Sequence, residues 1–145
     1  MTKIPYSAEY EPPCPVLTLR LASPTGGAGV GLIAVVDTGA DMTLVPEPDA
    51  RILGLPVISQ IRVAGVTGTA ERTDVFAAAI ELAGTHLLAE VVAFGKETIL
   101  GRDLLNRFDL RLDGPGQLLD IGAARRVRRR KRKRAPSTPN SHEHV

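Results

Sequence analysis

Apolar and polar positions along the middle of this chain follow the pattern of short β-strands. Apolar and polar residues alternate through residues 15–21, and in residues 59–63 the side chains of Ile61 and Val63 share one face. This period of two predicts strands that bury one face. Residues 30–36 are instead almost continuously apolar, which predicts a buried strand.

Two further apolar runs, residues 73–82 and 86–94, predict strands joined by a tight Ala-Gly-Thr turn. The connections in this part of the chain are short and punctuated by glycine. Together these segments predict an all-β domain, either a sandwich or a closed sheet.

One short helix is predicted near the end of the domain. Leu104, Leu105 and Phe108 have the i, i+1, i+4 spacing of the buried face of a helix over residues 102–108. Elsewhere we expect a Pro-rich loop with one helical turn at residues 49–53, and a final hairpin of residues 109–113 and 117–121.

Charge divides the chain into a body and a tail. The chain has 18 basic and 16 acidic residues, and nine of the basic ones lie within residues 125–134. Residues 1–124 hold nine basic against 15 acidic residues, which is a formal charge of −6. We expect an extended lead-in over residues 1–14, one folded domain over residues 15–122, and a disordered basic tail over residues 123–145.

The composition disfavours several classes of protein. There is no run of about 18 apolar residues that would predict a transmembrane helix, and the polar N-terminus lacks the apolar core of a signal peptide. Cys14 is the only cysteine, so no disulfide can form within the chain, which suits a reducing compartment. We therefore expect a cytoplasmic protein, or a nuclear one if the source is a eukaryote. No cluster of metal-ligating residues is apparent, and we expect neither a metal nor a cofactor.

The strongest candidate for chemistry is Asp37, which directly follows the apolar run of residues 30–36. A strand that leaves the core here places a carboxylate where it is both partly shielded and accessible. Thr38 can tie down the turn with its hydroxyl, and Gly39 permits a tight or positive-φ turn and the close approach of another chain. The same three residues could equally form an ordinary turn in which Asp37 caps a strand.

Two motifs, in this order, resemble those of the retroviral-type (retropepsin-like) aspartic proteases. The first is Asp-Thr-Gly-Ala at residues 37–40, and the second is Ile-Leu-Gly-Arg-Asp-Leu-Leu at residues 99–105. A Gly-punctuated hairpin lies between them. The resemblance covers residues 15–121, and it implies a closed β-barrel or sandwich with one short C-terminal helix, assembled as a homodimer.

The resemblance implies an aspartic endopeptidase that cleaves peptides. Such enzymes use two carboxylates that share a proton, one activating a water and the other protonating the substrate. Asp103 and Asp109 do not repeat the Asp-Thr-Gly context, so the resemblance implies that a second copy of the chain supplies the other Asp37. Thr38 would then hold the pair coplanar across the two-fold axis, and Gly39 would present its carbonyl to the substrate.

The resemblance also assigns residues to substrate binding. Ala40 would line a side-chain subsite, and Asp41 would bind the substrate backbone and form an ion pair with Arg102. Residues 63–69 would be a flap that closes over the peptide, with contacts from Val63, Gly65, Val66 and Gly68. Apolar side chains at the cut are expected, because Val45 would join Ala40, Val63 and Val66 in lining the cleft.

Other interpretations fit the same residues. Gly65 and Gly68 could form a plain hairpin, and Arg102 could simply face solvent at the start of a helix. The fold could serve as a non-catalytic dimerisation or peptide-binding module that retains Asp37 for its structure.

The tail offers a further alternative function. The nine cations of Arg125–Arg134 attract polyanions, with binding that weakens as salt rises. Because no aromatic residue is interleaved for base stacking, any binding of nucleic acid would be weak and nonspecific. The tail could also contact an acidic membrane surface or protein, or be inert.

Overall fold

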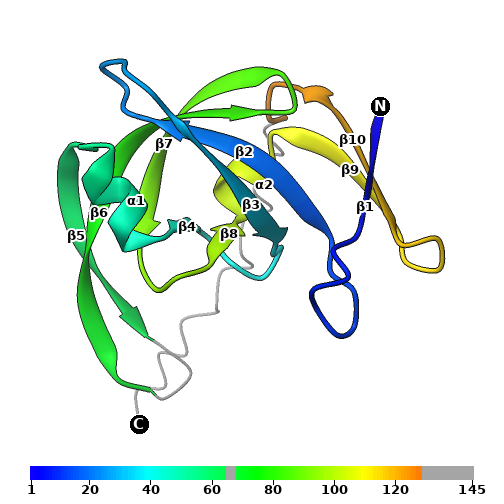
Figure 1. Cartoon of the computed structure of the whole chain (residues 1–145), viewed down its shortest axis with the longest axis horizontal. Helices are drawn as coiled ribbons and strands as arrows, with labels where there is room; N and C mark the ends of the chain where they lie inside the picture. The colour runs from blue at the N-terminus through cyan, green and yellow to red at the C-terminus, as the bar shows by residue number, and fades with distance from the viewer. Residues whose placement is uncertain (65–67, 129–145) are drawn as a thin grey trace, which may run out of the picture.

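A computed structural model of the chain describes residues 1–64 and 68–128 (Figure 1). Six strands form a closed barrel. In order around it they are β2 (Val16–Ala22), β3 (Val30–Val36), β8 (Thr98–Leu100), β4 (Thr43–Val45), β7 (Thr85–Ala93) and β6 (Ala70–Leu82). The barrel closes because β2 pairs with β6 as well as with β3. The structure thus confirms the predicted all-β fold.

The barrel core is built from the apolar positions of the alternating strands. Leu17, Leu19 and Leu21 on β2 are at most 1% exposed, while the residues between them face solvent. Strand β3 differs from the prediction of a fully buried strand, because its outer face is open and Ile33 is 67% exposed. A closed barrel covers only the inner face of each strand, so an apolar residue on the outside stays exposed unless another layer packs over it.

The chain termini form a second, three-stranded sheet. Strand β10 (Leu118–Ala124) lies between β1 (Thr2–Pro5) and β9 (Phe108–Asp113) and is antiparallel to both. The predicted lead-in therefore contains a strand, and β10 runs two residues past the predicted end of the domain at residue 122. Both edges of β10 are occupied, so the open edges of this sheet belong to β1 and β9.

Two short helices connect the strands. The first, α1 (Glu47–Ile52), is the helical turn expected in the Pro-rich loop. The second, α2 (Arg102–Leu105), ends before the predicted position, and Phe108 is the first residue of β9 rather than part of the helix. Phe108 is nevertheless only 8% exposed, so its burial was correctly indicated by the i, i+1, i+4 spacing although the backbone conformation was not.

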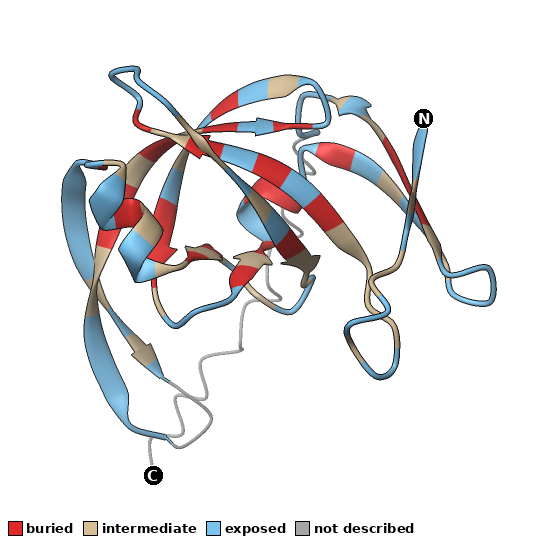
Figure 2. Cartoon of the chain, in the orientation of Figure 1, coloured by how far each residue is buried: buried red, intermediate tan, exposed pale blue. Residues whose placement is uncertain are grey.

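A hairpin of β5 (Val57–Ala64) and β6 extends away from the barrel (Figure 1). Among the strands that the structure describes, β5 pairs only with β6. Most of its residues are exposed, as the pale blue colour of this ribbon in Figure 2 indicates. Residues 65–67 lie outside the described residues. Within the described part of the chain, no helix is long and apolar enough to cross a membrane.

Candidate active site

Asp37 begins the turn that follows β3, at the end of the barrel where β3 and β8 run parallel. Its backbone N–H donates to the carbonyl oxygen of Leu100 on β8 at 3.0 Å, which ties the start of the turn to the barrel. One carboxylate oxygen, Oδ1, accepts the N–H of Gly39 at 2.9 Å, and the Asp37 carbonyl accepts the N–H of Ala40 at 3.2 Å. These bonds orient the Asp37 carboxylate within its own loop while the residue stays partly exposed.

Gly39 lies in the expected tight turn but lacks the positive φ that glycine would permit there. It is not among the glycines with positive φ in the described residues. Instead, a Cβ at this position would lie 3.2 Å from Oδ1 of Asp37, closer than ordinary van der Waals contact. A side chain here would therefore press on the carboxylate that the Gly39 N–H holds in place.

Arg102 braces the turn from the start of α2. Its N–H donates to the carbonyl oxygen of Ala40 at 2.8 Å, and its guanidinium donates to the carbonyl oxygen of Thr38, also at 2.8 Å. The expected ion pair with Asp41 is not among the ion pairs of residues 1–64 and 68–128, which are all formed by other residues. The cation thus binds the peptide backbone of the turn rather than a carboxylate.

A buried hydrogen-bond network links the two sequence motifs beneath the turn. The hydroxyl of Thr43, which is fully buried, donates to Oδ1 of Asp103 at 2.8 Å and accepts the N–H of Gly101 at 3.2 Å. The N–H of Thr43 donates to Oδ2 of Asp103 at 3.1 Å. A Cβ on Gly101 would lie 2.5 Å from the carbonyl oxygen of Met42, so only glycine fits between the two segments.

The sequence matches the protein family described as gag-polyprotein putative aspartyl protease over residues 28–107. This match covers more than half of the chain and includes both motifs. The chain belongs to this family. No curated protein matches the chain. The aspartyl protease family, the closed barrel and the Asp37 turn agree with the retropepsin-like resemblance seen in the sequence.

The substrate-binding residues expected of an aspartyl protease lie in two places. Ala40 and Asp41 follow Asp37 in the same turn, and Val63 and Gly68 lie on the β5–β6 hairpin, where Gly68 has φ +77°. The other two, Gly65 and Val66, lie outside the described residues. Val45 was wrongly expected to line the cleft: it is fully buried in the barrel core and presents no surface to a peptide.

The N-terminal segment also makes polar contacts that the sequence did not predict. Tyr10 donates its hydroxyl to Oε1 of Glu97 at 2.6 Å, which raises the pKa of Tyr10 to about 12. Burial raises the pKa of the Cys14 thiol, and the negative charges of Glu97 and Asp37 raise it further. No local pattern in the sequence marks Tyr10 or Glu97, because the two residues are 87 positions apart.

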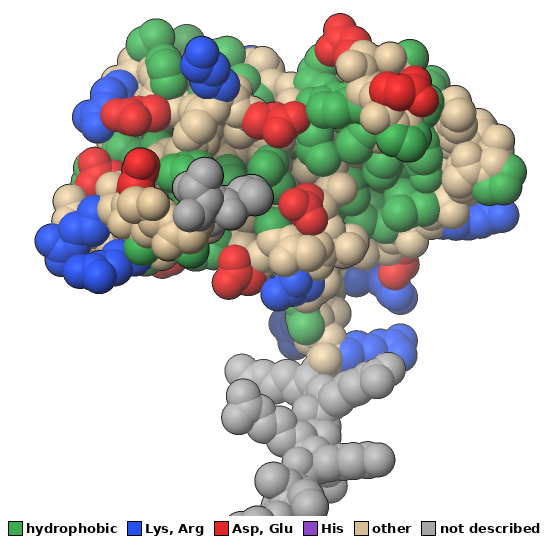
Figure 3. Space-filling view, turned by 90° about the horizontal axis from the view of Figure 1, so that it is seen from below, with side chains coloured by type: hydrophobic (Ala, Val, Ile, Leu, Met, Phe, Trp, Pro, Cys, Tyr) green, Lys and Arg blue, Asp and Glu red, His purple; other side chains and the backbone are tan. Residues whose placement is uncertain are grey.

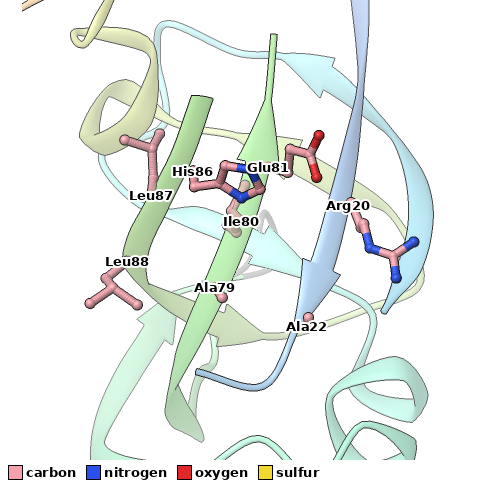
Figure 4. Close-up of a pocket in the computed structure, with 8 residues that line it drawn as sticks. All are labelled: Arg20, Ala22, Ala79, Ile80, Glu81, His86, Leu87 and Leu88. Carbon is pink, nitrogen blue, oxygen red and sulfur yellow. The ribbon is translucent and has the colours of Figure 1, made fainter. Parts of the chain in front are cut away.

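Two of the hollows in the described surface could be taken for a substrate site, but both lie outside the Asp37 turn. A groove of about 690 Å³ follows the exposed face of β3, between the N-terminal segment and α1, and Tyr10, Ile33 and Glu97 help to line it. A smaller hollow of about 210 Å³ lies on the wall formed by β2, β6 and β7, where Arg20, Glu81 and His86 come from three neighbouring strands (Figure 4). No residue of the Asp37 turn lines either hollow, so neither is the reaction centre.

Proposed function

We propose that this chain is a homodimeric aspartic endopeptidase that activates water between the Asp37 carboxylates of two copies. The observation that carries the proposal is the accessible Asp37 carboxylate, fixed by the Gly39 N–H on a turn that Arg102 braces. Membership of the aspartyl protease family supports the reaction class.

The bonds made by the two other candidate carboxylates support the need for a second copy. Asp103 accepts two hydrogen bonds from Thr43, and Asp109 is bound by Arg125 at 2.8 Å. Each is committed to a structural partner, so neither is free to act as the second catalytic carboxylate. A two-fold axis passing beside Asp37 would supply an identical group from the partner.

In the proposed reaction the two Asp37 carboxylates share one proton, because like charges about 3 Å apart cannot both ionise cheaply. The ionised carboxylate takes a proton from water, whose oxygen attacks the peptide carbonyl carbon. The protonated carboxyl gives its proton to the carbonyl oxygen, forming a tetrahedral intermediate. When the C–N bond breaks, the carboxyl that took the proton from water passes it to the leaving amine, and the other carboxylate takes a proton from one hydroxyl of the intermediate as the carbonyl re-forms, which restores the shared proton. The pair titrates as one unit.

The β5–β6 hairpin would act as the flap. It is an exposed two-stranded ribbon, and such ribbons have little stability of their own, so bending costs little. Closing over a bound peptide would exclude water from the Asp37 pair. Figure 3 views the molecule from below and shows hydrophobic side chains gathered on one part of this face, which suits contact with a peptide or a second copy.

The test is cleavage of an unfolded protein by the wild type and by Asp37→Asn, from acidic to neutral pH and over a range of enzyme concentrations. We expect no cleavage by Asp37→Asn, and a wild-type specific activity that rises as dimers form in sedimentation equilibrium. Asp113→Asn is the matched control, because it makes the same change at a surface turn and should leave cleavage unchanged.

Mixing the two proteins tests whether the site is shared between copies. If each active site needs one Asp37 from each copy, a ninefold excess of Asp37→Asn should lower wild-type cleavage to about one tenth through mixed dimers. Undiminished cleavage in the mixture would refute the shared site. If the wild type forms dimers but cleaves the substrate no faster than Asp37→Asn, the result would favour a non-catalytic module instead.

A further inference from the structure

A group of arginines gathers where the folded body ends and the basic run begins. Arg107, Arg126 and Arg128, together with Asn106, line a hollow of about 220 Å³ next to β9. None of these residues belongs to the Asp37 turn. We call this group, with Arg125, the arginine root. Figure 3 shows basic side chains close to the point at which the described chain ends.

The arginine root is held against the body by the last residues of the small sheet. Ala124 is the last residue of β10 to pair with β9, and the N–H of Arg125 then donates to the carbonyl oxygen of Arg107 at 2.8 Å. The guanidinium of Arg125 also donates to Oδ1 of Asp109 at 2.8 Å. The start of the basic run therefore has a fixed position on the folded domain.

The charges of the arginine root are poorly compensated by the protein itself. Within residues 1–64 and 68–128, Asp109 is the single acidic residue lining the hollow, and Arg125 already binds it. Among the described residues, no carboxylate lies within 4.0 Å of the guanidinium of Arg107, Arg126 or Arg128. Because like charges repel, an anion bound among these guanidinium groups would offset their mutual repulsion.

We propose that the arginine root is a site for the phosphate backbone of nucleic acid. A guanidinium group can donate two parallel N–H bonds to the oxygens of one phosphate, and the Asn106 amide adds a further donor. Val127 is the only apolar residue of residues 125–134, so this segment has little to insert into a membrane. Phosphate contacts carry no information about base sequence, so we expect binding that is independent of sequence.

The experiment measures binding of a labelled DNA duplex and a labelled single-stranded RNA to the full chain by fluorescence anisotropy at several salt concentrations. Each lost phosphate contact lowers the slope of log K against log salt by about 0.9 for duplex DNA. We expect that loss for Arg107→Ala and about twice that loss for the double variant Arg126→Ala, Arg128→Ala. Arg72→Ala, on the distant hairpin, removes the same charge and should leave the slope unchanged.

A chain ending at residue 128 tests the arginine root without the basic residues 129–134. The proposal expects this shortened chain to keep measurable binding that Arg107→Ala then removes. It is overturned if Arg107→Ala matches the wild type at every salt concentration, or if the shortened chain binds no better than an Arg107→Ala version of itself. Binding to phosphatidylserine vesicles without binding to either nucleic acid would also overturn it. None of these readouts depends on proteolysis.

Discussion

Thr43 and Asp103 are 60 positions apart in the sequence, yet the backbone N–H and the hydroxyl of Thr43 both bind the Asp103 carboxylate. The Thr43 hydroxyl also accepts the N–H of Gly101, so a single buried side chain joins β4 to the start of α2. This contact lies beneath the turn that carries Asp37, since Arg102, between Gly101 and Asp103, binds the carbonyls of that turn. The network therefore links the fold of the barrel to the position of the Asp37 carboxylate.

Thr43→Val should destabilise the fold, because it keeps the side-chain shape but leaves the buried Gly101 N–H without its hydrogen-bond partner. Leaving a buried polar group unsatisfied costs about 1–3 kcal/mol. The free energy of unfolding from urea titration measures the effect. Thr18→Val on the exposed face of β2 is the control, and a substitution there should change stability by less than about 0.5 kcal/mol. Equal effects at the two sites would show that the network contributes nothing.

Gly101→Ala should be more harmful than its size suggests. The added methyl would lie 2.5 Å from the Met42 carbonyl oxygen, and backbone cannot move aside as a flexible side chain can. We expect a loss of about 1–3 kcal/mol in the free energy of unfolding, as for other overpacked sites, together with a displaced Arg102. Gly114→Ala is the control, because no atom lies within 4 Å of its added methyl. A Gly101→Ala protein as stable as the Gly114→Ala protein would contradict the close approach.

The sequence predicts the longer strands of the barrel because their determinants are local, but those patterns leave a sandwich and a closed sheet both open. The alternation in β2 and the apolar run of β3 each report a strand directly, and the position of Asp37 after β3 follows from them. Strand β1 was missed as a paired strand, because its four residues form no strong pattern and its partner, β10, lies at the other end of the domain. The role of Arg102 was misassigned for a related reason. A sequence shows the opposite charges of Asp41 and Arg102, but it does not show that the guanidinium binds the backbone carbonyl of Thr38.

Tyr10 should titrate abnormally because of Glu97. The hydrogen bond to the Glu97 carboxylate raises the pKa of Tyr10 from 10.0 to about 12, since ionisation removes the donated proton and sets two anions side by side. The sign follows: the contact stabilises the fold below about pH 10 and this contribution is lost as pH rises through about 12. Phenolate absorbance of a Tyr6→Phe protein measures Tyr10 alone.

The control for this titration is Glu97→Gln in the same Tyr6→Phe background. It should lower the Tyr10 midpoint toward 10.0, because the neutral amide removes the charge and weakens the bond. Far-UV circular dichroism at each pH establishes that the protein is still folded. A Tyr10 midpoint near 10.0 in the folded protein with Glu97 intact would show that the contact does not persist in solution.

Cys14 should report the charge state of the Asp37 turn. Burial is the main reason that its thiol pKa is raised, and the charges of Glu97 and Asp37 add to the shift. Alkylation by iodoacetamide proceeds through the thiolate, so its rate against pH gives the Cys14 pKa. We expect Asp37→Asn and Glu97→Gln each to lower that pKa part of the way toward 9.0, the burial contribution being unchanged. Glu81→Gln on the far wall of β6 should have no effect. If Asp37→Asn left the alkylation profile unchanged while Glu97→Gln moved it, the Cys14 thiol would be too far from the Asp37 carboxylate to sense its ionisation.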